Sequence, residues 1–106
     1  MNAPRRVVIT GTGLVSALGT GTEKNWQALL AGKSGVARIS RFETGKLATS
    51  IAAEVKDFNA EEFMDRKEAR RMDPFCQYAL AGAELAMRES QMPVGLDKAH
   101  GYDPDR

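Results

Sequence analysis

Residues 5–19 have the sequence Arg-Arg-Val-Val-Ile-Thr-Gly-Thr-Gly-Leu-Val-Ser-Ala-Leu-Gly, and this stretch decides the fold class. Its β-branched run at residues 7–9 is closed by Gly11, a pattern that predicts a short strand covered on both faces. Strands of that kind are typical of α/β proteins, whose helices cover a mostly parallel sheet. The sequence therefore predicts an α/β fold that starts with a strand and a glycine-rich turn.

A first helix is expected directly after this turn, over residues 21–31. Thr20 and Glu23 have the spacing of a capping box, in which each side chain satisfies a backbone N–H at the helix start. Gly32 can adopt the left-handed conformation that ends a helix. Three apolar side chains repeat at helical spacing and predict one buried face: Trp26, Leu29 and Leu30.

The next segments alternate between loop and regular structure. Residues 33–49 are rich in Gly, Ser, Thr and charge, so we expect an extended surface loop there. The alternation of Ile51, Ala53 and Val55 with less apolar neighbours predicts a strand with one buried face. Asn59 is placed to cap a short helical turn.

The longest predicted helix begins at Asp73 and Pro74. Asp is a favoured N-cap, and Pro at the first helical position loses no hydrogen bond. Apolar residues surround most of this helix until Arg88, so it requires burial on several sides. The predicted strands and the first helix offer little surface for that, and we expect the isolated chain to be incomplete, aggregation-prone or molten.

Composition excludes several classes of function. Fifteen basic and fourteen acidic residues leave a net charge of +1, unlike the strongly basic balance of nucleic-acid-binding domains. No apolar run approaches the roughly 18–20 residues that cross a bilayer. There is no secretory signal, and a single cysteine cannot form an internal disulfide, so we expect a cytoplasmic protein without a membrane span.

Two constellations resemble catalytic or binding motifs but fit them poorly. Gly11 and Gly13 suggest a dinucleotide-binding turn, yet the third glycine is replaced by Ser16 and no acidic residue follows a second strand. We interpret the glycines as a tight strand exit. Cys76 and His100 are the only thiol and imidazole; we interpret them as a core cysteine and an exposed histidine, and expect no metal site and no cofactor.

One charge cluster is a candidate binding surface. Its four members stand at positions i, i+1, i+4 and i+5, which project onto one side of a helix: Arg66, Lys67, Arg70 and Arg71. From spacing alone, the cluster is either a solvated helix face or a docking surface for an acidic helix or a phosphate-bearing partner.

Four blocks in fixed order resemble the N-terminus of the β-ketoacyl-acyl-carrier-protein synthase II family of thiolase-like condensing enzymes. They are Arg-Arg-Val-Val-Ile-Thr-Gly-Thr-Gly at 5–13, Asn-Trp-Gln-Ala-Leu-Leu-Ala-Gly-Lys-Ser-Gly at 25–35, Val-Lys-Asp-Phe-Asn at 55–59 and Arg-Lys-Glu-Ala-Arg-Arg-Met-Asp at 66–73. The resemblance covers nearly the whole chain but only the first part of the family's length.

The resemblance implies a partial thiolase-like fold, from a layered α/β/α/β/α architecture. Residues 1–106 would be the N-terminal portion of the synthase N-terminal domain, with no second domain. The family works as a homodimer and elongates fatty-acyl chains by decarboxylative Claisen condensation with malonyl-acyl carrier protein. Its catalytic Cys-His-His set lies beyond residue 106, so no catalytic residue is expected here and the chain alone should be inactive.

The resemblance also assigns a binding role to part of the basic cluster. Lys67, Arg70 and Arg71 match family positions that contact the acidic recognition helix of acyl carrier protein. The alternatives are a short non-catalytic protein that binds acyl carrier protein, and a small nucleotide-binding α/β protein.

Overall fold

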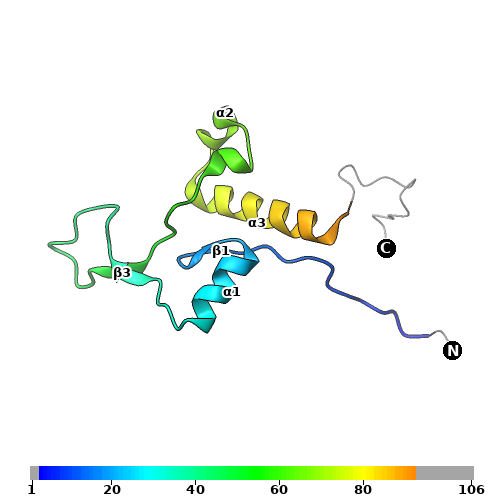
Figure 1. The fold of residues 1–106 in the computed structure, drawn as a ribbon. Coiled ribbons are helices and arrows are strands. Elements are labelled where there is room, and N and C mark those ends of the chain that lie inside the picture. The colour runs from blue at the N-terminus through cyan, green and yellow to red at the C-terminus, as the bar shows by residue number, and fades with distance from the viewer. Residues whose placement is uncertain (1–2, 93–106) are drawn as a thin grey trace.

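Two small antiparallel sheets and two longer helices make up the described part of the chain, residues 3–92 of a computed structural model (Figure 1). In chain order the elements are β1 (Val15–Ser16), β2 (Gly19–Thr20), α1 (Thr22–Leu30), β3 (Val36–Arg38), β4 (Ile51–Ala53), the 3-10 helix η1 (Ala60–Glu62), α2 (Arg66–Ala69) and α3 (Pro74–Ser90). β1 pairs with β2 and β3 pairs with β4. Figure 1 shows the β1–β2 hairpin and α1 on one side of α3, with α2 at its N-terminal end.

The predicted strand at residues 7–9 is not formed, and this prediction is wrong for the described chain. The segment is extended but unpaired, and the side chains of Val7 and Ile9 are 91% and 87% exposed. A strand exists only through ladder hydrogen bonds to a neighbour, and no segment within residues 3–92 supplies them.

Gly11 and Gly13, interpreted above as a tight strand exit, allow the backbone of this segment to approach the backbone of α3 closely. A Cβ atom on Gly13 would lie 1.8 Å from the carbonyl oxygen of Gly82, and one on Gly11 would lie 2.2 Å from that of Ala86. The extended segment therefore touches α3 backbone to backbone. Between the glycines, Thr12 donates from its N–H and its hydroxyl to the Glu89 carboxylate, at 2.9 and 3.0 Å.

The start of α1 differs from the predicted capping box. Gly21, with φ 99°, is the N-cap residue and there is no side-chain cap, so Thr20 stands one residue too early to reach the helix. Instead Asn25, only 4% exposed, donates to the carbonyls of Gly19 and Gly21 at 3.0 and 2.8 Å and accepts from the Ser16 hydroxyl. An internal side chain thus ties the hairpin turn to the helix.

The end of α1 is as predicted. Gly32 has φ 68°, and the N–H groups of Gly32 and Lys33 donate to the carbonyls of Leu29 and Ala28. This is the Schellman arrangement of a left-handed C-terminal residue. The predicted buried apolar face is wrong, however: Trp26 is 54% exposed, and the helix buries Asn25 and Ala28 instead.

The segment predicted as a loop over residues 33–49 contains β3. Its partner β4 confirms the predicted strand, in a register that places Ala37 opposite Ala52. The predicted inward face of β4 is wrong, because Ile51 and Ala53 are exposed while Ala52 is half-buried. The sequence did not predict β3, because a strand of three residues is too short to show an alternation of apolar and polar side chains.

A carboxylate closes the β3–β4 hairpin. Glu54 accepts from the backbone N–H and hydroxyl of Ser40, at 2.9 and 3.0 Å, and from the N–H of Arg41. Its side chain is 9% exposed. The Ser40 N–H bond is the main cause of a pKa below the ordinary value for Glu54.

α3 begins with Pro74 at its first position, as predicted, although Asp73 makes no side-chain cap. Asn59 accepts from the N–H of Glu61 at 3.1 Å, which confirms the predicted capped turn. An aromatic cluster joins that turn to α3: Phe58 meets Tyr78 edge to face at 5.0 Å and stacks with Phe63 at 5.9 Å.

The hydrophobic core of the described part is very small. Among residues 3–92, only Ala28 and Ala81 are buried apolar residues. The radius of gyration is 18.4 Å, against about 13 Å for a compact chain of 100 residues. The sequence predicted that α3 carries apolar residues on most of its sides and that the chain offers little to cover them. In the structure few sides of α3 are covered, and Phe75 and Leu80 are exposed.

Candidate functional site

The basic cluster lies on α2 and the turn that follows it. Arg66 and Lys67 belong to the helix, which ends at Ala69, while Arg70 and Arg71 belong to the turn. The prediction of a single helix face is therefore only partly correct. All four side chains are exposed on one short segment, so the structure does bring the predicted residues together.

Gln77 of α3 holds this segment in place. Its side-chain amide donates to the carbonyl of Ala69 at 2.8 Å and, at 3.4 Å, to that of Met72. The Ala69 carbonyl, at the end of α2, also accepts from the N–H of Met72 at 3.2 Å, so Gln77 adds a second donor that ties this turn to α3. Sequence reasoning missed Gln77, since its only signal was a polar residue in an otherwise apolar run.

Most of the cluster's charge is not neutralised. Arg66 pairs with Glu61 at 3.5 Å, but both side chains are well exposed and such pairs contribute little to stability. No carboxylate of residues 3–92 forms an ion pair with Lys67, Arg70 or Arg71. These three cations, one on α2 and two on the turn after it, form a surface suited to an acidic partner.

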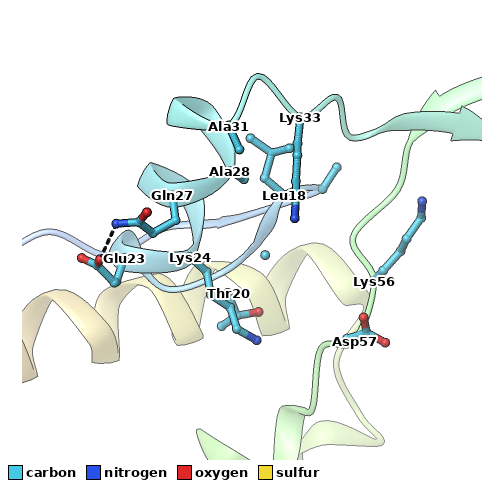
Figure 2. A pocket seen from close by; sticks show the side chains of 12 residues that line it. Leu18, Thr20, Glu23, Lys24, Gln27, Ala28, Ala31, Lys33, Lys56 and Asp57 are labelled. Atoms are coloured by element: carbon cyan, nitrogen blue, oxygen red, sulfur yellow. Dashed lines mark hydrogen bonds between the residues drawn. The ribbon is translucent and has the colours of Figure 1, made fainter.

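A separate pocket of about 650 Å³ lies between α1 and the segment that follows β4. Figure 2 shows Lys33 reaching toward this space, while the Lys24 side chain points away from Lys33 and the Lys56 side chain on the opposite wall extends away from both. Thr20 also lines the pocket, and its hydroxyl is buried without a hydrogen-bond partner. A buried polar group left in that state costs about 1–3 kcal/mol.

The remaining candidates have no site around them in the described chain. Cys76 is half-buried in the first turn of α3, and His100 lies outside the described residues. Within residues 3–92 no three His, Cys, Asp or Glu side chains gather as metal ligands. No helix in that range is long and apolar enough to cross a membrane.

Comparison with known proteins identifies the family. The profile of the β-ketoacyl synthase N-terminal domain matches residues 4–99. The chain belongs to the β-ketoacyl synthase family. The resemblance drawn from the four sequence blocks is thereby confirmed.

Relatives of this β-ketoacyl synthase chain carry the name 3-oxoacyl-[acyl-carrier-protein] synthase 2. The protein of Coxiella burnetii is 49% identical and that of Vibrio cholerae 43% identical, each over 95 residues. Each alignment covers 90% of this chain and 23% of the relative. The chain thus spans about a quarter of the length of these curated relatives.

A solved structure of the ishigamide ketosynthase/chain length factor has the same fold over most of the chain. The TM-score is 0.78 at 37% identity, covering 86% of this chain and 23% of that one. The predicted fold class, a partial ketosynthase fold of the α/β class, is confirmed.

Proposed function

We propose that this chain is the N-terminal part of a 3-oxoacyl-acyl-carrier-protein synthase and supplies part of its docking surface for acyl carrier protein. The identity to synthases over the N-terminal quarter of their length supports the first statement. The single observation that carries the second is a set of three cations without an ion-pair partner among residues 3–92: Lys67 on α2, and Arg70 and Arg71 on the turn that Gln77 holds.

The docking role follows from the chemistry of this surface. Acyl carrier protein would present an acidic helix, and exposed cations attract such a helix over a distance set by the salt concentration. Because all three side chains remain solvated, we expect them to act mainly on the association rate and on the orientation of the complex.

The reaction of the whole synthase would be a decarboxylative Claisen condensation. An acyl chain held as a thioester on a cysteine accepts the carbanion formed when malonyl-acyl carrier protein loses carbon dioxide; a carbon–carbon bond forms and the thiolate leaves. We propose that the Cys-His-His set for these steps lies outside this chain. The 106-residue chain, a portion of the synthase N-terminal domain, would then be inactive alone.

Two further parts of the proposal concern the whole enzyme. We infer a homodimer from the resemblance to the synthase II family. We also infer a cytoplasmic setting from the same resemblance.

The test is the binding of a fluorescently labelled acyl carrier protein at several salt concentrations. We expect the triple variant Lys67→Glu, Arg70→Glu, Arg71→Glu to bind about tenfold or more weakly and to show a reduced salt dependence. Lys46→Glu, an exposed lysine in the loop between β3 and β4, is the matched control. Equal binding by the triple variant and the control would refute the docking role.

A further inference from the structure

We propose that the Arg41 side chain is a latch that fixes the orientation of the β3–β4 hairpin on α3. One terminal guanidinium nitrogen donates to the Val55 carbonyl at 3.0 Å and to the Tyr78 hydroxyl at 2.9 Å. Val55 follows β4, whereas Tyr78 belongs to α3. A single side chain thus joins the hairpin to the longest helix. This latch is independent of the docking role of the basic cluster.

The hairpin has few other ties to the chain. Its strands bond to each other, and among residues 3–92 the Arg41–Tyr78 bond is the only hydrogen bond between residues 34–55 and the rest. Figure 1 shows the hairpin projecting from the two longer helices. No helix or strand forms at residues 31–35, before β3, or at residues 54–59, after β4. Segments of this kind, at the ends of regular elements, are where hinge motions occur.

The Glu54 carboxylate orients the Arg41 side chain. It lies 3.9 Å from the Arg41 Nε and accepts from the backbone N–H of Arg41 at 3.3 Å. Ser40 fixes this carboxylate in turn, through its own N–H and hydroxyl. The donors of a guanidinium point in fixed directions, so a group held near Nε presents its terminal nitrogen to a defined place.

Tyr78 is a fixed acceptor for this nitrogen. Its ring meets the Phe58 ring edge to face, with centroids 5.0 Å apart, and Phe58 stacks in turn on Phe63. A packed tyrosine ring has few rotatable bonds, so its hydroxyl loses little freedom when it forms a hydrogen bond. The hydroxyl is therefore a fixed point on α3 against which the hairpin is set.

The latch determines where the hairpin lies relative to the basic cluster. Gln77, which holds the turn after α2, is the neighbour of Tyr78 on α3. Consecutive residues of that helix thus hold two separate parts of the chain. The loop of the hairpin carries exposed apolar side chains, among them Phe42 and Leu47. With the latch closed these side chains stay in one place, and with the latch open they sample a range of positions.

The test is a distance measurement between spin labels on the hairpin and on α3. The labels are attached at Lys46→Cys, in the loop between β3 and β4, and at Ala83→Cys, an exposed position of α3, in a Cys76→Ser background. With Arg41 and Tyr78 present, we expect one narrow distribution of distances, which represents the latched hairpin.

Tyr78→Phe removes the acceptor and keeps the ring that packs on Phe58. We expect the ratio of latched to released hairpin to fall by roughly fivefold, as for the loss of one hydrogen bond near the surface. Arg41→Ala should broaden the distribution at least as much. Arg38→Ala is the matched control, because Arg38 is an exposed arginine of β3 that forms no ion pair with a carboxylate of residues 3–92.

Broadening in Tyr78→Phe and Arg41→Ala, with Arg38→Ala unchanged and the helix content retained, supports the latch. A distribution that is already broad in the unchanged chain would overturn it, as would an unaltered distribution in Tyr78→Phe or equal broadening in Arg38→Ala. Loss of helix content in Tyr78→Phe would also overturn it, since the hydroxyl would then support α3 rather than the hairpin. Failure here leaves the docking of acyl carrier protein untouched, because that test uses other variants.

Discussion

Substitution of Gly13 by alanine tests the close contact between the N-terminal segment and α3. The new Cβ would stand 1.8 Å from the carbonyl oxygen of Gly82, where real Cβ contacts are almost never under 3.0 Å. Because the obstacle is helix backbone, the two segments must separate by more than an ångström. Overpacking of this kind costs typically about 1–3 kcal/mol.

Separation of the segments also breaks a second set of contacts. The two hydrogen bonds from Thr12 to the Glu89 carboxylate, at 2.9 and 3.0 Å, do not survive such a shift. Bonds to charged groups contribute about 1.5–3 kcal/mol when well shielded, but these are exposed, so we place their share at the low end. We expect Gly13→Ala to cost about 2–4 kcal/mol in all, a large part of the stability of an ordinary domain.

The assay is urea unfolding followed by circular dichroism, with hydrogen exchange of the α3 amides as a local measurement. With a slope near 1 kcal/mol per molar urea, the midpoint should fall by about 2 M or more, or α3 should lose its protection in water. Gly45→Ala is the control, since Gly45 has no atom within 4 Å of its would-be Cβ. Equal midpoints and equal α3 protection for the two variants would refute the reasoning.

Three other predictions concern single side chains. Gln77→Leu removes the donor to Ala69 and Met72, and we expect weaker acyl carrier protein binding with α3 helicity retained; unchanged binding would show that the turn holds without it. Asn25→Ala should destabilise the β1–β2 hairpin by about 1–3 kcal/mol, seen as faster hydrogen exchange there, whereas unaltered exchange would contradict its role. Because the pKa of Glu54 is lowered in the folded chain, its contribution to stability is complete above its ordinary pKa near 4.5 and is lost as the pH falls through the lower folded value. The amide NMR shift of Ser40 should therefore stay constant from neutral pH down to about 4.5 and change below it. A change near neutral pH would exclude Glu54 as the cause.

Features set by neighbouring residues could be predicted from the sequence, and features set by distant partners could not. The C-terminal turn at Gly32 and the start of α3 at Pro74 depend only on local backbone preferences. The segment at residues 7–9 becomes a strand only if another segment pairs with it, and its own sequence does not show whether such a partner exists. For the same reason the sequence did not indicate that Asn25 would replace the capping box.

In the candidate site, too, local features were predictable from the sequence and long-range contacts were not. The basic cluster was visible as a run of four charges, and the family resemblance singled out Lys67, Arg70 and Arg71 within it. Their support by Gln77 depends on how α3 folds back against α2, which no spacing rule specifies. The pocket draws Lys24 and Lys56 from segments far apart in the chain, and only the folded structure places them together.

The bonds between Thr12 and Glu89 have a consequence for synthesis of the protein. The two residues are 77 positions apart, so at roughly 5–20 residues per second the ribosome needs about 4–15 s to deliver Glu89 after Thr12. During that interval Thr12 has no carboxylate acceptor, and its N–H and hydroxyl remain bonded to water. We expect the N-terminal segment to dock on α3 only as a late step of synthesis, after the end of that helix has left the ribosome.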